Sequence, residues 1–244
     1  MYFSKLIITF LPLVSGFFNY NGANMPKEFP FNSIEMAPYH PKIHGYSNIG
    51  LMGDIHAQGV PFATKVIDTL AYSGRNIRKE IAVRLFKQSD SNAEVIDIGS
   101  STGMFTKCLW DAGFKNLSAF DASPEMLKYA KKRLPKEINL YLGNAGLAVP
   151  EADIYVCGFV MHELPSIARK AIISNIYEKV RPGGQLLVVD IHQTYIPKEV
   201  MLQGEPFCLD YIENFDKELR ASDFTVKSKT WIENHVQTWW CQKV

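Results

Sequence analysis

The fold is decided by residues 95–105, with the sequence Val95-Ile96-Asp97-Ile98-Gly99-Ser100-Ser101-Thr102-Gly103-Met104-Phe105. The first four residues are β-branched and apolar apart from Asp97, which is typical of a strand buried on both faces. Two glycines bracket a short polar turn, and we expect Ser101 or Thr102 to cap the following helix, which ends at Gly113. Strand, glycine turn and helix predict the opening unit of a doubly wound α/β sheet, where ligands bind beyond the carboxyl ends of the strands.

The turn favours one kind of cofactor. A dinucleotide needs the spacing G-x-G-x-x-G, so that its pyrophosphate can lie against bare backbone, but this chain has Gly99-x-x-x-Gly103. The Asp97 carboxylate would repel a pyrophosphate and attract an ammonium group. Asp121 ends the next predicted strand, roughly twenty residues past the glycines, where an acid can accept hydrogen bonds from ribose hydroxyls. A ribose, an amino group and no phosphate describe S-adenosylmethionine.

These residues carry a resemblance to a known family. The pattern Asp97-x-Gly99-x-x-x-Gly103, followed by Phe120-Asp121, resembles the signature of class I S-adenosylmethionine-dependent methyltransferases. The sequences MHELP at 161–165 and RPGGQLLVVD at 181–190 are similar to small-molecule methyltransferases of the ubiquinone/menaquinone type. The resemblance covers about residues 94–190, and Ser101 departs from it, since the family usually has glycine there.

The resemblance also implies roles for individual residues. The acid before the turn and the turn itself would hold the methionine end of the cofactor, and the acid after the second strand would hold the ribose. The loop after the third predicted strand, 138–142, would contact the adenine through Asn144, although an ordinary turn asparagine remains a second interpretation. The expected cofactor-binding residues are Asp97, Gly99, Ser100, Ser101, Gly103, Asp121, Ala122, Asn144, Ala145, Gly158 and Phe159.

We expect one Rossmann-like, doubly wound, seven-stranded sheet with an antiparallel last strand, because residues 224–232 and 236–244 alternate as a hairpin. The chain divides into an apolar segment (1–24), an N-terminal lid or cap (25–90) and a methyltransferase domain (91–244). The cap combines a loop over 25–54 with amphipathic helices at 62–72 and 76–86. On the first helix the expected inner face contains Phe62, Val66, Ile67 and Leu70.

The two candidate catalytic residues lie in the loop that follows the fourth predicted strand, 153–157. Methyl transfer from a sulfonium is an in-line displacement, so the protein chiefly positions the acceptor and excludes water. His162 is the better candidate for a base or an acceptor-orienting group, because imidazole titrates near neutral pH. A structural histidine is its alternative. Glu163 is the second candidate, with helix capping or solvent exposure as its alternative.

The cap loop contains several polar and aromatic residues close together: His40, His44, Tyr46, Asn48 and His56. A lid over the substrate and a solvated loop are both open interpretations. The spacing matches no metal-ligand pattern, so we predict no metal site. The candidate substrate residues are His44, Tyr46, His56 and the more distant His192.

Composition limits the partners. The 244-residue chain is 47% hydrophobic, with a formal net charge of +1 and no basic block, so we expect a small-molecule acceptor and no nucleic acid. An apolar acceptor suits the apolar segment at residues 6–18. That segment has three interpretations: a secretory signal, a membrane-surface anchor or a hydrophobic cap. We expect a cytoplasmic or membrane-associated location, because the cofactor is found inside the cell, and a secretory signal is the alternative.

Two other functions compete with a methyltransferase. A nicotinamide-dependent oxidoreductase would use a similar sheet, but Asp97 and the glycine spacing disfavour it. A non-catalytic protein that binds S-adenosylmethionine would keep the same cofactor residues.

Overall fold

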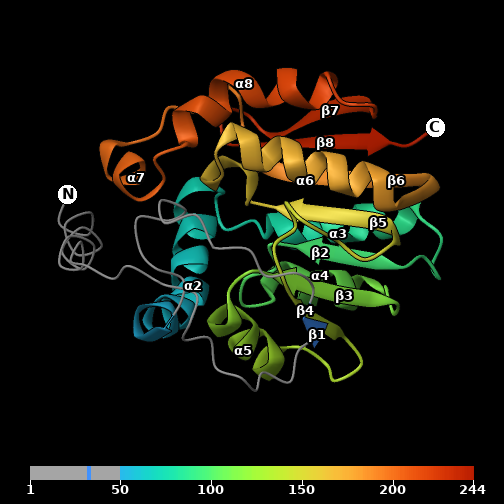
Figure 1. The fold of residues 1–244 in the computed structure, drawn as a ribbon. Helices are drawn as coiled ribbons and strands as arrows, with labels where there is room; N and C mark the ends of the chain where they lie inside the picture. Colours follow the sequence, from blue (N-terminus) through green and yellow to red (C-terminus); the bar gives the residue numbers. More distant parts are fainter. Residues whose placement is uncertain (1–31, 34–49) are drawn as a thin grey trace.

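A mixed sheet of eight strands carries the fold in the computed structural model, which describes residues 32–33 and 50–244. The strands follow the order β1-β4-β3-β2-β5-β6-β8-β7 (Figure 1). Strands β1 to β6 pair in parallel, whereas β8 runs antiparallel to both of its neighbours, β6 and β7. Their bounds are β1 Asn32–Ser33, β2 Val95–Ile98, β3 Leu117–Asp121, β4 Asn139–Leu142, β5 Ala152–Gly158, β6 Val180–Ile191, β7 Thr225–Ile232 and β8 Val236–Gln242.

The predicted sheet with its antiparallel last strand is confirmed by β2 to β8. The two-residue strand β1 was not predicted. It pairs in parallel with β4 and lies in a segment that we expected to be loop. Pairing with the edge of an existing sheet allows so short a segment to be a strand, and no local sequence signal marks it.

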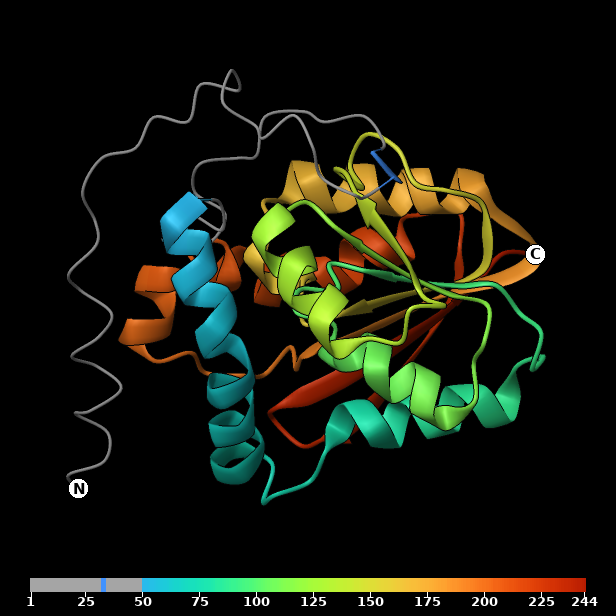
Figure 2. The ribbon, with the colours of Figure 1, turned by 90° about the horizontal axis from the view of Figure 1, so that it is seen from below.

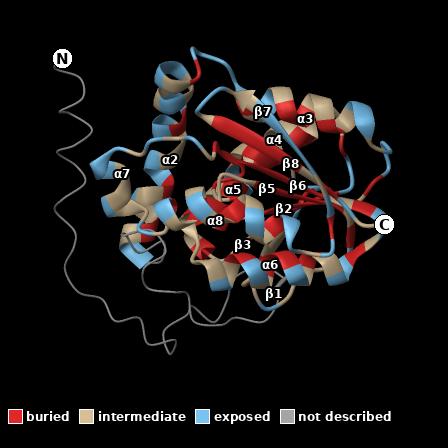
Figure 3. Ribbon diagram, turned by 90° about the horizontal axis from the view of Figure 1, so that it is seen from above, coloured by how far each residue is buried: buried red, intermediate tan, exposed pale blue. Residues whose placement is uncertain are grey.

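Helices cover both faces of the sheet (Figure 2). Buried side chains of α3, α4 and α5 join one core cluster, whereas those of α6 and α8 join the other. Along β2, Val95 faces the first cluster while Ile96 and Ile98 face the second, as the alternation of side chains in a strand requires. The central strands are correspondingly buried (Figure 3). The helices are α2 Gly50–Ala71, α3 Ile77–Gln88, α4 Met104–Ala112, α5 Pro124–Arg133, the 3-10 turn η2 Met161–Glu163, α6 Ser166–Lys179, α7 Glu199–Gly204 and α8 Cys208–Arg220.

Helix α2 differs from its prediction in length and in orientation. It begins at Gly50, inside the expected loop, and its inner side is formed by the small residues Gly53, Ala57 and Thr64. The predicted inner face is exposed instead, with Phe62 at 71% and Leu70 at 78%. Small residues allow the helix backbone to approach the domain closely, so the larger apolar side chains point outward.

Near the carboxyl terminus, the short helix α7 precedes α8, and Glu205 lies between the two helices. Strand β6 runs over Val180–Ile191, next to β5. Among residues 50–244, no helix is both long enough and apolar enough to cross a membrane.

Strands β2 and β5 are hydrogen-bonded neighbours and point the same way, so their carboxyl ends meet at one edge of the sheet. Helices α2 and α7 lie at this edge in both ribbon views (Figures 1 and 2). The glycine turn follows β2, and the predicted catalytic residues follow β5. The topology therefore brings the two halves of the predicted site together.

Candidate functional site

The turn after β2 needs glycine at its first position. Gly99 has a φ of +67°, and a Cβ atom there would lie 2.2 Å from Cγ2 of Val160. Ser101 also has a positive φ, 51°, and Ser100 donates its backbone N–H to the carbonyl of Phe120 (3.0 Å). The chain thus turns tightly against the end of β3 and against the loop after β5.

The predicted side-chain cap of α4 is wrong. Gly103 is the N-cap residue, and no side chain accepts a hydrogen bond from the first turn. The Thr102 hydroxyl instead accepts from Nη1 of Arg133 (2.7 Å), while the Ser101 hydroxyl contacts the Met126 sulfur (3.3 Å). The amino-terminal N–H groups of α4 therefore lack the expected hydroxyl partner.

Asp97 is a buried carboxyl at the end of β2. Its Oδ2 accepts a hydrogen bond from the Thr106 hydroxyl at 2.6 Å. Burial raises the pKa of Asp97 to about 7, although the Thr106 hydrogen bond and the positive charge of Arg78 lower it, and Asp121 raises it further. A cationic ligand would therefore bind favourably beside Asp97, because a positive charge stabilises the ionised form of a buried carboxyl.

Asp121 ends β3 and fastens the glycine turn. Its Oδ2 accepts from the backbone N–H of Ser101 (2.7 Å), and its Oδ1 accepts from that of Ser123 (2.8 Å). These two contacts fix the Asp121 carboxylate between the glycine turn and the start of α5. Ala122 follows directly, and the Ser123 hydroxyl caps α5 by accepting from the Met126 backbone N–H at 3.2 Å.

The loop after β5 faces this turn. A Cβ atom on Gly158 would lie 2.3 Å from the Phe105 ring, so helix α4 approaches the backbone closely here. Phe159 has a φ of 59°, and the guanidinium carbon of Arg78 lies 4.5 Å from its ring centroid. Tyr72 stacks on the same ring at 6.5 Å. Arg78 is a site residue that the sequence did not indicate; it also lies close enough to Asp97 to shift its pKa.

His162 is buried between two carboxylates. Its Nδ1 lies 2.5 Å from Asp190 Oδ1, and its Nε2 lies 3.3 Å from Glu205 Oε2. Burial lowers the pKa of His162, but the two carboxylates outweigh it and hold that pKa well above its usual range. Both ring nitrogens face carboxylates, which stabilise the protonated ring and so disfavour His162 as a general base. Glu163 lies beside this group.

Asp190 and Glu205 were not predicted as site residues. Asp190 had a signal, because it ends the strand next to β5 and parallel strands end at the same edge. Its Oδ2 accepts from the backbone N–H of Met161 (2.9 Å), which fixes the loop after β5. Glu205 had no signal, since only the tertiary fold brings the end of α7 to His162.

A buried arginine anchors the same loop from behind. Arg169 is fully buried and donates to the carbonyl of Leu164 (2.7 Å). It also pairs with Asp210 and Glu218 of α8, each at 2.7 Å. The loop that contains His162 is therefore held between α6, α8 and β6.

The remaining predicted residues lie in different settings. Asn144 accepts from the backbone N–H of Gly146 (2.9 Å), as a turn asparagine does, and Ala145 is buried. His192 contacts two threonine hydroxyls, at 2.9 and 3.1 Å, and so links β6 to β7. His56 is partly buried on α2. Four lie outside the described residues: His40, His44, Tyr46 and Asn48.

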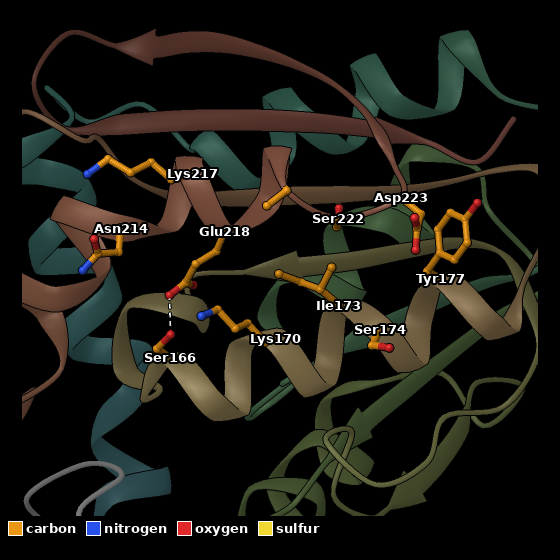
Figure 4. Close-up of a pocket in the computed structure, with 11 residues that line it drawn as sticks. Ser166, Lys170, Ile173, Ser174, Tyr177, Asn214, Lys217, Glu218, Ser222 and Asp223 are labelled. Atoms are coloured by element: carbon orange, nitrogen blue, oxygen red, sulfur yellow. Dashed lines mark hydrogen bonds between the residues drawn. The ribbon is translucent and has the colours of Figure 1, made fainter.

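A separate cleft of about 610 Å³ lies between α6 and α8 (Figure 4). Its walls include Lys170, Lys217 and Glu218, and the Ser166 hydroxyl donates to Glu218 at 2.5 Å. None of the predicted site residues lines this cleft, so it does not belong to the site at the sheet edge.

Comparison with known proteins agrees with this geometry. Residues 96–188 match the family described as "Methyltransferase domain". An uncharacterised methyltransferase-like protein of Schizosaccharomyces pombe is 28% identical over 104 residues, covering 41% of this chain and 39% of the relative. A carboxy-S-adenosyl-L-methionine synthase of a Shewanella species is 26% identical over 148 residues, covering 57% and 56%. This chain thus aligns with only 39–56% of the length of these two curated relatives.

A solved structure shows the same architecture. Human N-acetylserotonin methyltransferase, in complex with S-adenosylmethionine, has a TM-score of 0.57 at 17% identity, covering 78% of this chain and 56% of that one. Residues 96–188 thus match a methyltransferase domain, and the strand order of the chain is that of an S-adenosylmethionine-dependent methyltransferase fold.

Proposed function

We propose that this chain binds S-adenosylmethionine at the turn 99–103 and transfers its methyl group to a small-molecule acceptor. One observation carries the proposal: two carboxylates flank a turn that leaves no room for a side chain at Gly99. Asp97 is suited to the cofactor's ammonium group, and Asp121 is an acid at the end of β3, the position from which it would accept hydrogen bonds from ribose hydroxyls. Arg78 supplies a positive charge near Asp97 that can pair with the cofactor's carboxylate.

The acceptor would lie beside the loop 158–163. A bound sulfonium would supply an activated methyl group for in-line transfer to a nucleophilic acceptor atom, and its sulfur would keep the electron pair of the broken carbon–sulfur bond as a neutral thioether. Gly158 and Phe159 would line the transfer position, and the buried His162 would orient the acceptor. A proton released by the acceptor can pass to the Glu163 carboxylate or to solvent. The small-molecule class is supported by the acetylserotonin methyltransferase whose fold this chain shares.

Calorimetry with S-adenosylhomocysteine tests the cofactor proposal. We expect binding by the wild-type chain and a loss of about tenfold or more in the Asp121→Ala variant, because ribose hydroxyls would lose a charged acceptor. An unchanged affinity would remove Asp121 from the ribose site. The same titration with NADH tests the oxidoreductase alternative, which would gain support only if NADH bound in place of S-adenosylhomocysteine.

A panel of small acceptors with methyl-labelled S-adenosylmethionine tests catalysis. Mass spectrometry should show a labelled product that depends on the chain. Cofactor binding without methylation across a broad panel would favour a non-catalytic binding protein. The lid interpretation of residues 25–90 has its own test. His44→Ala should alter acceptor turnover and spare cofactor affinity, and the opposite pattern would contradict a lid.

A further inference from the structure

A group of metal-ligating side chains lies next to the proposed acceptor position. His162, Glu163 and Glu205 each offer one ligand atom, and these atoms lie within 4.8 Å of one another. His162 and Glu163 belong to η2, after β5, whereas Glu205 follows α7. Two segments far apart in the sequence thus converge on one point, which their separate sequence patterns did not predict.

The imidazole is oriented as metal-bound imidazoles are. His162 is more than nine-tenths buried, and its Nδ1 lies 2.5 Å from Asp190 Oδ1. Metal-ligating histidines almost always donate their second ring N–H to a carboxylate or carbonyl, which fixes the tautomer and raises the basicity of the metal-facing nitrogen. Asp190 is itself fixed by the backbone N–H of Met161. When Nδ1 holds the proton, Nε2 points its lone pair toward Glu205.

Distance and charge agree with this orientation. Nε2 of His162 lies 3.3 Å from Oε2 of Glu205. That separation suits two ligands of one tetrahedral ion whose bonds are each about 2.1 Å long. Three carboxylates, those of Asp190, Glu163 and Glu205, surround a single imidazole. A divalent cation balances more of this negative charge than one ring proton does.

We propose that His162, Glu163 and Glu205 bind a divalent transition-metal ion, with Asp190 as a positioning residue behind the imidazole. One nitrogen and two carboxylate ligands suit Mn²⁺ or Zn²⁺ better than Mg²⁺ or Ca²⁺, which take oxygen ligands. Three protein ligands leave a coordination position open. Metal binding stands on these side chains alone, whereas occupation of the open position by an acceptor oxygen rests on the proposed function.

The test titrates MnCl2 and ZnCl2 into the metal-free full-length chain, using calorimetry and the Mn²⁺ electron paramagnetic resonance signal. We expect one ion per chain, and an affinity about tenfold or more weaker in both Glu205→Gln and Glu163→Gln. Glu199→Gln is the matched control, because Glu199 is an exposed carboxylate at the start of α7. It should bind the ion as the wild type does.

Absence of Mn²⁺ and Zn²⁺ binding, or binding that both glutamine variants leave unchanged, would overturn the metal site. If Glu205→Gln fails to fold, the Glu163→Gln variant decides, since Glu163 is only partly buried. Titration of S-adenosylhomocysteine on the same samples separates the two proposals. If the chain binds S-adenosylhomocysteine but no metal, only the metal site is refuted. If the folded chain binds metal but no S-adenosylhomocysteine, the cofactor proposal is refuted.

Discussion

Cofactor affinity should depend on pH through Asp97. The pKa of this carboxyl is about 7 because it is buried at the end of β2, with Thr106 as its hydrogen-bond donor. An ammonium group of the cofactor needs the ionised carboxylate. Binding should therefore weaken as pH falls through 7, and cofactor binding should release a proton near that pH.

The magnitude follows from the fraction of Asp97 that is ionised. With a pKa of about 7, about one molecule in eleven is ionised at pH 6, against about ten in eleven at pH 8. The affinity for S-adenosylhomocysteine should thus fall about tenfold from pH 8 to pH 6, or about 1.4 kcal/mol. Thr106→Val removes the hydrogen bond that favours the charge, so it should move the loss of affinity to higher pH.

Without cofactor, the free energy of unfolding should change with pH in the direction opposite to that of the cofactor affinity. The native state holds the Asp97 proton up to about pH 7, whereas the unfolded chain releases it near 3.8. The native state therefore binds more protons in this window, and its free energy of unfolding falls as pH rises, by on the order of 4 kcal/mol in total. Asparagine does not ionise, so the Asp97→Asn variant lacks this loss of stability. Its melting temperature minus that of the wild type should therefore increase from pH 5 to pH 8.

Calorimetry at pH 6, 7 and 8 on the wild type and Asp97→Asn checks the reasoning. The wild type should show the pH-dependent affinity, and the asparagine variant should bind weakly at every pH. A wild-type affinity that is constant over this range, or an equal slope in Asp97→Asn, would refute the role of the carboxylate.

Three further variants test the surroundings. Gly99→Ala should lower the free energy of unfolding by about 2–4 kcal/mol, because alanine is strained at a positive φ and its Cβ clashes with Val160. The control Gly183→Ala has the same backbone strain but no neighbour within 4 Å, so it should lose only about 1–2 kcal/mol. Equal losses would refute the close approach of Val160 to Gly99. Arg78→Gln should weaken S-adenosylhomocysteine binding by about 2 kcal/mol in calorimetry, and unchanged affinity would remove Arg78 from the site. Arg169→Met should lower the free energy of unfolding in denaturant by about 3–5 kcal/mol, because the carboxylates of Asp210 and Glu218 lose their cationic partner. A loss below about 1 kcal/mol would contradict that role.

The sequence predicted the parts of the fold that local patterns encode. The turn from Gly99 to Gly103 and the final hairpin both follow from short-range spacing and propensity. Asp97 and Asp121 could be placed on the same edge because parallel strands end together. These features needed no knowledge of distant contacts.

The rest depends on tertiary contacts. Glu205 reaches His162 only because α7 folds back over the sheet edge, and Arg78 reaches Phe159 only through the packing of α3. The inner face of α2 was misassigned for the same reason: apolar spacing finds a stripe of large residues, but close helix packing selected Gly53 and Ala57 instead. Thr102 looks like a helix cap in sequence, and only the fold reveals Arg133 as its partner.

A crystal structure of the chain grown with S-adenosylhomocysteine and NADH together tests the central claim most directly. The nucleoside should lie over residues 99–103, with its ribose hydroxyls on Asp121 and its ammonium group beside Asp97. NADH bound over that turn, with no S-adenosylhomocysteine there, would contradict the assignment of this turn to S-adenosylmethionine.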